Sequence, residues 1–591
     1  MNMSGRVKRF NAANPDHRAC PLNVTLTLQL DDPIKSCCRL LCLVVLVLLP
    51  LQLPAQESVN IRVNANAKLG AFSPNWAYFG HDEPNFTYMP YGRELLNELS
   101  TLTTSPVHIR THNLLTTGDG TPALKWGSTN AYTEDVTGQP VYNWTILDQI
   151  FDSYHAAGIT PFVEIGFMPK VLSVHPDPYQ HGWPKGSLWT GWAYPPKDYR
   201  KWAELVRQWV NHSVERYGRK EVESWDWEVW NEPDIGYWQG TPKEYYQLYD
   251  FAADAVKRAL PSAHVGGPGT TGPGNAKAAE FLRNFLVHCA HGKNYATGKA
   301  GAPLDFISFH AKGSVRMADG HVQMGIQPHL KSIAKGFEIV AGFPEFRQLP
   351  VLLTESDPEG CAACSVAAHP EDAYRNTSQY ASYNAAVLRD ALELADHYRI
   401  NFQGILTWAF EFEDQPYFAG FRALTTRGID LPVLNGFRMF GMMGGERIQA
   451  QSSAGLSLDA ALTSGARSVP DINALATRDE HTIRILVWNY RDDDVPAPAA
   501  VIDVSIEGVR SPSHRVLLQH FRVDQATSNA YTLWKEMGSP QEPSAEQQAR
   551  LKAAGQLQTL HSPEWLNAAA DPIEVRFALP SQGVSLIELS W

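Results

Sequence analysis

Short apolar runs alternate with amphipathic stretches over about residues 69–445 of the chain. The apolar runs have the length and composition of strands buried in a parallel sheet. The stretches between them, such as Tyr199–Tyr217, Pro242–Leu260 and Gln379–Tyr398, have the period of helices with one apolar face. Strand and helix alternate eight times, which predicts a (β/α)8 barrel. The eight predicted strands are Leu69–Phe79, Val107–Thr111, Thr160–Ile165, Ser224–Trp230, His264–Gly267, Phe306–His310, Val351–Thr354 and Gly404–Trp408.

The pattern changes over residues 448–591, where short strand-like runs such as Thr482–Trp488 and Val501–Ile506 are separated by turn residues. This pattern predicts a C-terminal β-sandwich with a small helical insertion at about Ser544–Ala554. Residues 56–447 are then the predicted barrel domain. An early run within it, Val59–Val63, is a candidate to cross over and join the sandwich.

The N-terminal segment has the layout of a secretory signal. Lys35 and Arg39 precede an apolar run, Leu40–Leu53, and Ala55 follows it. We therefore expect residues 1–55 to be a signal peptide or N-terminal extension that is cleaved near Ala55. The run is short for a bilayer span, which needs about 20 residues, so no membrane attachment is expected after cleavage. The mature protein is predicted to be periplasmic or secreted, and an uncleaved N-terminal anchor is the alternative.

Charge and aromatic content narrow the range of ligands. The formal net charge is −12 and no basic stripe interrupts it, so binding to nucleic acid is not expected. The chain contains 17 Trp and 22 Tyr residues. Flat rings stack on the apolar faces of sugars, although large cores also use aromatic residues.

Three cysteines lie beyond the predicted signal. Cys361 and Cys364 form a C-x-x-C pair, and Cys289 stands alone. In an exported protein the pair predicts either a disulfide or two free thiols. A zinc site would need two more ligands at a recognisable spacing, and none is apparent. No metal and no cofactor is expected.

Two predicted strands end in a glutamate. The Trp-rich fourth strand leads into Asn231, Glu232 and Pro233, and the proline stops the strand there. The seventh strand leads into Thr354 and Glu355. Catalytic groups of barrels lie where strands end at the C-terminal face, so both glutamates can face one mouth.

Such a pair is what a retaining glycosidase needs. Two carboxyl groups about 5–5.5 Å apart allow one to attack the anomeric carbon while the other protonates the leaving oxygen and later activates water. We assign Glu355 as the nucleophile and Glu232 as the general acid/base, which requires environments that separate their pKa values. The alternatives are that Glu232 is an ordinary loop carboxylate and that Glu355 only caps the next helix.

These residues also carry a family resemblance. Trp230–Pro233 on strand four and Thr354–Glu355 on strand seven resemble glycoside hydrolase family 39, which contains β-xylosidases and α-L-iduronidases. The resemblance covers roughly residues 57–591, and the stretch Glu411–Arg422 is similar to proteobacterial β-xylosidases. It implies retention of configuration, no cofactor, and release of single sugars from a non-reducing end.

Neighbouring residues receive supporting roles from chemistry and from this resemblance. Asn231 should hydrogen-bond the sugar 2-hydroxyl, a contact that strengthens in the transition state. Arg110 and His112 end the second strand, where the guanidinium would keep Glu355 ionised. A structural ion pair at the barrel rim is the alternative for Arg110.

Three further strand ends supply candidates for the sugar pocket. His310 ends strand six and is predicted to orient the nucleophile or a hydroxyl, with a buried structural histidine as the alternative. Trp408 ends strand eight and is predicted to form the floor of the sugar subsite, although a buried Trp needs no ligand. Glu164 and Phe167 follow strand three and are predicted to line the pocket.

The sugar itself is predicted from charge. Lys312 and Arg422 resemble the cations with which the iduronidase branch binds a uronate carboxylate. Glu411, Glu413 and Asp414 could neutralise them and repel a carboxylate. We therefore predict a β-D-xylosidase acting on xylo-oligosaccharides. An iduronidase-like or arabinose-releasing enzyme is the first alternative, and a non-catalytic carbohydrate-binding protein is a remote one.

Overall fold

The computed structural model describes residues 58–181, 188–189, 191–569 and 571–591. All of them belong to one compact unit, Glu57–Trp591. The predicted leader, residues 1–55, lies outside the described residues. Within the described ranges, every helix is too short or too polar to cross a bilayer.

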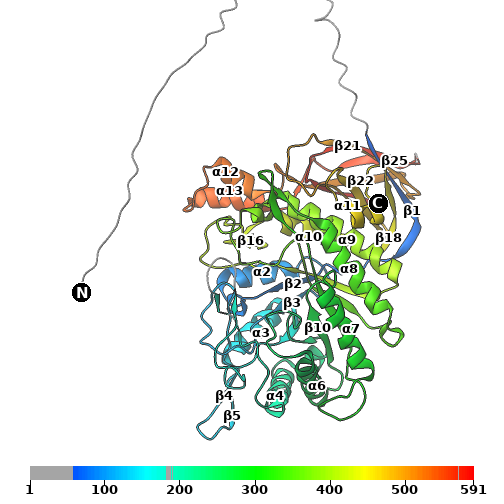
Figure 1. Cartoon of the computed structure of the whole chain (residues 1–591). Helices are drawn as coiled ribbons and strands as arrows, with labels where there is room; N and C mark the ends of the chain where they lie inside the picture. The colour runs from blue at the N-terminus through cyan, green and yellow to red at the C-terminus, as the bar shows by residue number, and fades with distance from the viewer. Residues whose placement is uncertain (1–57, 182–187, 190, 570) are drawn as a thin grey trace, which may run out of the picture. The chain divides into compact units, whose positions relative to one another are not determined.

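Eight parallel strands close into a barrel, as the alternation predicts (Figure 1). They neighbour one another in chain order, and the last strand pairs with the first. Each is a short, almost wholly buried run, which explains why the apolar pattern found them. The strands are β2 (Tyr78–His81), β3 (His108–Thr111), β6 (Thr160–Ile165), β9 (Asp226–Val229), β10 (His264–Thr270), β11 (Phe306–Lys312), β14 (Val351–Asp357) and β15 (Phe402–Trp408).

The first barrel strand begins later than predicted. Leu69 belongs to an earlier strand, β1 (Val59–Ala71), which is not part of the barrel, and the first barrel strand is β2. Leu69 is 57% exposed, so its apolar character does not report burial in a barrel wall. The prediction merged the end of β1 with the start of β2.

Helices cover the barrel and begin where the sequence supplies caps. The α4 helix starts after Asp198, whose carboxylate accepts hydrogen bonds from two backbone N–H groups of the first turn. The α6 helix starts with a capping box between Thr241 and Glu244. The helices of this layer are α2 (Pro90–Ser100), α3 (Thr145–Ala157), α4 (Tyr199–Tyr217), α6 (Pro242–Ala259), α7 (Ala276–His291), α8 (Ile326–Ala341), α9 (Ser378–Tyr398) and α10 (Pro432–Met442).

The C-terminal region forms a separate ten-stranded sheet with its own apolar core. Most neighbouring strands run antiparallel, and alternate residues face the core, as in β21. Besides β1, its strands are β18 (Glu446–Ser452), β19 (Asp471–Arg478), β20 (Thr482–Tyr490), β21 (Ala500–Glu507), β22 (Arg515–Val523), β23 (Gln558–Thr559), β24 (Glu564–Asn567), β25 (Ile573–Leu579) and β26 (Val584–Ser590). The predicted strand-rich region is therefore a distinct β-sheet.

The β1 strand lies inside this sheet, between β18 and β21. Ile61 is opposite Ser452 in the antiparallel pair with β18 and opposite Val504 in the parallel pair with β21. The first described strand of the chain thus completes a sheet built from its last 150 or so residues. The helical insertion contains α12 (Ala530–Glu536) and α13 (Ala545–Gly555).

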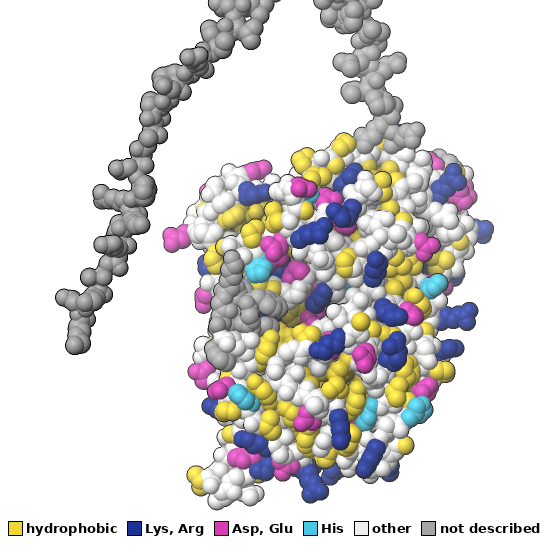
Figure 2. All heavy atoms as spheres, viewed as in Figure 1, with side chains coloured by type: hydrophobic (Ala, Val, Ile, Leu, Met, Phe, Trp, Pro, Cys, Tyr) yellow, Lys and Arg dark blue, Asp and Glu magenta, His cyan; other side chains and the backbone are white. Residues whose placement is uncertain are grey.

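Hydrogen bonds join the sheet to the barrel helices. The Asp492 carboxylate accepts from the backbone N–H of Ile326 at the start of α8, and Gln379 on α9 donates to the Asp492 carbonyl. Cys361 and Cys364 form a disulfide in the loop after β14, and Cys289 is a buried free cysteine. On the face shown in Figure 2, basic and acidic side chains are mixed with scattered apolar ones.

Candidate active site

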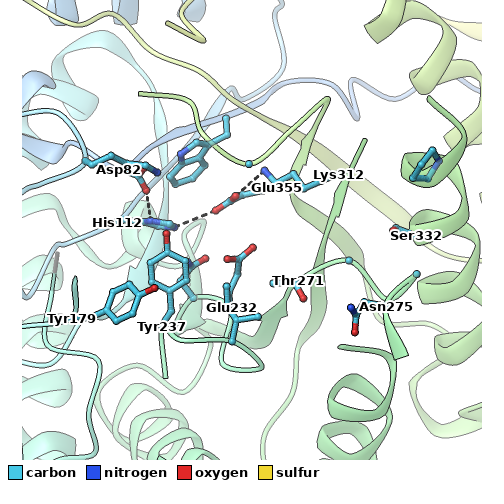
Figure 3. A pocket seen from close by; sticks show the side chains of 18 of the residues that line it. Asp82, His112, Tyr179, Glu232, Tyr237, Thr271, Asn275, Lys312, Ser332 and Glu355 are labelled. Atoms are coloured by element: carbon cyan, nitrogen blue, oxygen red, sulfur yellow. Dashed lines mark hydrogen bonds and ion pairs between the residues drawn. The ribbon is translucent and has the colours of Figure 1, made fainter. Parts of the chain in front are cut away.

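A cavity of about 620 Å³ lies at the C-terminal ends of the barrel strands. Strand ends supply its floor, and the loops that follow the strands, together with the first turns of α8, supply its walls (Figure 3). Among the described residues it is lined by Asp82, His112, Lys125, Tyr179, Asn231, Glu232, Ile235, Tyr237, Thr271, Gly272, Gly274, Asn275, Pro328, Lys312, Lys331, Ser332, Glu355, Gly360 and Trp408.

Glu232 enters the cavity through an unusual turn at the end of β9. Trp230 and Glu232 both have positive φ, at 76° and 44°, a left-handed conformation that is costly for residues with a side chain. Neighbouring barrel strands hold the turn, because the Trp230 N–H donates to the Ile165 carbonyl and the Glu232 N–H to that of Gly269. In a regular strand the neighbouring side chains of Asn231 and Glu232 would point to opposite faces. Because of the turn, both side chains line the cavity.

Glu355 projects from β14 into a dense group of basic side chains. Its Oε1 lies 3.1 Å from Arg110 Nη1 and 3.3 Å from His112 Nε2. Its Oε2 lies 2.9 Å from Lys312 Nζ. Two barrel strands, β3 and β11, therefore bring three basic side chains to this one carboxylate.

The two glutamates face each other across the cavity (Figure 3). A carboxylate oxygen of Glu232, one of Glu355 and a ring nitrogen of His310 all lie within 4.8 Å of one another. Strands four and seven of the barrel thus deliver both carboxyl groups to one place.

Their surroundings shift the two acids in opposite directions. Burial, with the nearby negative charge of Glu355, raises the pKa of Glu232 to about 7. Burial would also raise the pKa of Glu355, but His310, Lys312 and His112 hold it well below its ordinary value. At neutral pH the site therefore holds one ionised carboxylate and one carboxyl group that retains a proton much of the time.

His310 contacts Glu232 more closely than Glu355. Its Nδ1 lies 2.9 Å from Glu232 Oε1 and 3.6 Å from Glu355 Oε2. Burial lowers the pKa of His310 to about 4, so the ring is neutral at pH 7. The positive charge that keeps Glu355 ionised at that pH consequently comes from its other neighbours, among them Lys312.

Arg110 lies beneath the cavity floor and joins four of the barrel strands. It is fully buried and bonds to Glu228 at 2.6 Å, to Glu164 at 3.1 Å and to Glu355 at 3.1 Å. A further N–H donates to Asn231 Oδ1 at 3.1 Å. This bond fixes the amide so that its NH2 group is the donor available to a ligand.

Glu164 and Phe167 do not line the cavity, contrary to the prediction. Glu164 is fully buried between Arg110 and His112, and the Phe167 ring packs edge-on against His112 and Trp230. Both therefore support residues of the cavity wall. Trp408 does line the cavity, and its role as the floor of a sugar subsite stays a prediction.

Two charged residues that the sequence did not reveal close one end of the cavity. Asp82 follows β2, and its carboxylate lies 2.6 Å from His112 Nδ1 and pairs with the Lys125 ammonium group. Burial opposes protonation of His112, but Glu164, Asp82 and Glu355 hold its pKa well above the ordinary value. The strand-end rule could have identified Asp82 if β2 had been placed correctly. Lys125 lies in a long loop and gives no such signal.

Comparison with known proteins identifies the family. The model of glycosyl hydrolases family 39 matches residues 59–563. The chain belongs to glycosyl hydrolase family 39. Membership makes this family 39 chain a glycoside hydrolase, in agreement with the resemblance seen in its motifs.

The relatives of this family 39 chain include β-xylosidases and α-L-iduronidases. The β-xylosidase of Geobacillus stearothermophilus is 28% identical over 471 residues, which cover 76% of this chain and 81% of that protein. The α-L-iduronidase of Homo sapiens is 27% identical over 383 residues, which cover 60% of this chain and 55% of that protein. The match to the human protein thus spans about half of its length.

Solved structures share the fold. A monomeric β-xylosidase from Caulobacter crescentus CB15 matches with a TM-score of 0.69 and 22% identity, covering 90% of this chain and 99% of that one. A bacterial orthologue of human α-L-iduronidase matches with a TM-score of 0.73 and 19% identity, covering 90% and 84%. Barrel and sheet are therefore common to both groups.

The predicted pair of uronate-binding cations is not assembled in this family 39 chain. Lys312 lines the cavity, but it bonds to Glu355 at 2.9 Å and to Asp357 at 2.5 Å. Arg422 is fully buried, pairs with Glu359 at 2.6 Å and lies 3.5 Å from Asp357. It does not line the cavity, so its assignment as a substrate contact is wrong.

The three acidic residues that were predicted to neutralise these cations lie elsewhere. Glu411 does not line the cavity, and its carboxylate accepts hydrogen bonds from the Thr425 hydroxyl and the Arg427 N–H. Glu413 accepts from the Tyr91 N–H, and Asp414 is exposed. The prediction that these three acids neutralise the cations is wrong, because the partners come from β14 and the loop after it.

Glu232, His310 and Glu355 form the one group of described residues close enough to share a metal ion. A metal would have to compete with Lys312 and Arg110, both already bound to the Glu355 carboxylate. The group therefore fits paired-carboxylate chemistry better than metal coordination.

Proposed function

We propose that this family 39 chain is a retaining, exo-acting β-D-xylosidase that releases xylose from the non-reducing ends of xylo-oligosaccharides. Glu355 is the nucleophile and Glu232 the general acid/base. The observation that carries the proposal is the pair of carboxyl groups that face each other within 4.8 Å and have oppositely shifted pKa values.

The first step forms a glycosyl ester. The Glu355 carboxylate attacks the anomeric carbon, and the bond from that carbon to the glycosidic oxygen breaks while protonated Glu232 gives its proton to the departing oxygen. The Asn231 amide NH2 is placed to donate to the sugar 2-hydroxyl. Trp408 offers a ring face to the apolar face of the sugar.

The second step releases the sugar. Ester formation removes the negative charge of Glu355, which is one cause of the raised pKa of Glu232. Glu232 gave up its proton in the first step, and the lower pKa keeps it ionised, so it can act as a base and take a proton from water. Water attacks the anomeric carbon, the ester bond to Glu355 breaks, and net retention results.

Charge pairing supports a neutral sugar. Two lysines that line the cavity near the nucleophile have anionic partners: Lys312 pairs with Glu355 and Asp357, and Lys125 pairs with Asp82. A uronate carboxylate in this part of the cavity would have to share them with these acids. The β-xylosidase of Geobacillus stearothermophilus supports the same choice.

An iduronidase-like enzyme is the alternative that a specific observation favours, because Lys125 and Lys312 do line the cavity. A panel of nitrophenyl glycosides that contains the β-D-xyloside, the α-L-iduronide and the α-L-arabinofuranoside separates the candidates. We expect turnover of the xyloside and little of the others. Turnover of the iduronide without that of the xyloside would replace our choice of sugar.

Azide rescue tests the two roles. Glu232→Ala with an activated xyloside and azide should give the β-glycosyl azide, because azide attacks the intact ester. Glu355→Ala should give the α-azide, because azide then replaces the nucleophile. The same anomer from both variants would refute the assignment of roles.

Export remains a proposal that rests on the N-terminal sequence, in which Leu40–Leu53 follows basic residues. Recovery of the mature protein outside the cytoplasm, with an N-terminus near residue 56, is the expected result.

A further inference from the structure

The cavity has two unlike ends (Figure 3). Asp82 and His112 lie on one side of the two glutamates, and Thr271, Asn275 and Ser332 lie on the other. The first end is closed, because Asp82, Lys125 and Trp408 are all at least nine-tenths buried. The second is open, since Asn275 and Lys331 are exposed. An exo-acting enzyme must hold its terminal ring at the closed end, which leaves the open end for the leaving group.

The open end is built from the loop after β10 and the second turn of α8. The loop is tied to the segment that carries the acid, because the Asp234 carboxylate accepts hydrogen bonds from the N–H and hydroxyl groups of Thr271. Asn275 caps α7 by accepting from the Lys277 N–H. The walls of this end are therefore fixed relative to Glu232.

Ser332 offers an unused polar group at this end. The side chain is only 7% exposed, it lines the cavity, and its hydroxyl has no hydrogen-bond partner among the described residues. Gly272 and Gly274 face it: a Cβ at either position would lie 2.8 or 2.7 Å from Ser332 Oγ. Glycine at these two positions keeps the hydroxyl uncovered. A leaving group that reaches this end can therefore hydrogen-bond to the hydroxyl.

The charge of the open end differs from that of the closed end. The anionic residues that line the cavity are Asp82, Glu232 and Glu355, all at its closed end or centre. Lys125 and Lys312 are paired with acids. Lys331 lies at the open end and is the only lining lysine for which no ion pair is found within the described ranges.

We propose that the open end is the leaving-group subsite and that Lys331 there selects leaving groups with an anionic substituent, such as the carboxylate of a uronic acid side group on the next sugar. Ser332 supplies a neutral hydrogen bond to the same leaving group. The inference rests on the proposed function, because that function fixes which end holds the released sugar.

Three β-xylosides form the test. The first has a 4-nitrophenol leaving group, and the second has the same phenol with a carboxylate on the ring. The third is β-xylosyl fluoride, whose leaving group is too small to reach the open end. For each variant we take the ratio of kcat/KM for the carboxylated aryl xyloside to kcat/KM for the neutral one. When this ratio is compared between variants, the difference in intrinsic reactivity between the two phenols cancels.

Lys331→Gln should lower this ratio by up to about fivefold, the upper range for one exposed ion pair, and Lys331→Glu should lower it further. Added salt should lower the ratio of the unaltered protein in the same direction. Lys335→Gln is the matched control, because Lys335 is an exposed lysine one turn further along α8 that pairs with Glu338 and does not line the cavity. Its ratio should equal that of the unaltered protein.

The outcomes separate the two proposals. Hydrolysis of β-xylosyl fluoride together with an unchanged ratio in Lys331→Gln would overturn the leaving-group inference alone. Failure to hydrolyse any of the three xylosides would overturn the proposed function. Equal losses in Lys331→Gln and Lys335→Gln would show a general effect of charge and would also overturn the inference.

Ser332→Val gives an independent test of the subsite. We expect lower kcat/KM for both aryl xylosides and an unchanged value for β-xylosyl fluoride, because only the aryl groups reach the open end. An equal loss on all three substrates would mean that Ser332 supports the fold and would remove it from the subsite.

Discussion

The surroundings of Glu355 and Glu232 differ although each residue simply follows an apolar barrel strand. Arg110, His112 and Lys312 converge on Glu355 from other strands. Glu232 is met at 2.9 Å by His310, a ring that is neutral at pH 7. The same side chain is therefore an ionised carboxylate in one place and a protonated acid in the other. The role of each glutamate is set by what the neighbouring strands deliver, and not by its own segment.

The contrast also makes the two residues dependent on each other. The charge of Glu355 is a cause of the raised pKa of Glu232, second only to burial. Any change that removes the charge on one side should move the titration of the other. The following predictions test this dependence.

Removal of the negative charge of Glu355 should have the largest effect on activity. Glu355→Gln should lower kcat by up to about 10⁶-fold, which is the loss seen when the catalytic nucleophile of an enzyme is removed. It should also lower the pKa of Glu232, because a neutral amide replaces a negative charge. Steady-state kinetics and ¹³C NMR titration of the Glu232 carboxyl group measure the two effects.

Glu411→Gln is the matched control. Glu411 is a buried acid, but it does not line the cavity. We expect kcat to stay close to that of the unaltered protein. A loss comparable to that of Glu355→Gln would contradict our placement of the site.

Arg110→Met should come next. The substitution removes the one buried guanidinium group that bonds to Glu228, Glu164 and Glu355. Breaking a buried ion pair in this way costs about 3–5 kcal/mol of the free energy of unfolding. The acidic limb of the pH profile should move upward, because the carboxylate of Glu355 loses a stabilising neighbour.

Urea unfolding and the pH dependence of kcat/KM provide the measurements for Arg110→Met. Arg216→Met is the control, because Arg216 pairs with Asp152 at 2.6 Å on the surface. An exposed pair contributes about 0–1 kcal/mol. Similar costs for the two variants would argue against the network beneath the floor.

The smallest expected effect is a shift in the pH dependence of kcat/KM. Glu232 must carry a proton to act as an acid, and its pKa is raised to about 7, so kcat/KM should fall as pH rises through that value. Lys312 lowers the pKa values of both glutamates. Lys312→Met should therefore move both limbs of the profile upward. A basic limb that stays in place would mean that another group controls it.

Much of the barrel could be predicted because buried parallel strands are short apolar runs bounded by polar residues. The one misplaced strand, Leu69–Phe79, fails for a physical reason: Leu69 is apolar but exposed at the end of β1. The run Val59–Val63 was correctly named as a candidate to join the C-terminal sheet. Its two partner strands lie more than 370 residues away in sequence, and no local pattern identifies them.

The site was predictable to the extent that it consists of strand ends. Glu232, Glu355, Asn231 and His112 all follow from that rule, and all line the cavity. The pairing of charges was not predictable. The partner of Arg422 is Glu359, a loop residue that lies near it only after folding.

The place of β1 has a consequence for synthesis and for protein engineering. The β1 strand finds both of its neighbours only after residues 446–507 have been made, so the sheet stays unfinished until then. Until that time the backbone N–H and C=O groups of β1 have no neighbouring strand, and strands of other chains could pair with them. A barrel expressed alone as residues 56–447 would retain this orphaned strand, and a C-terminal fragment alone would have a gap between β18 and β21.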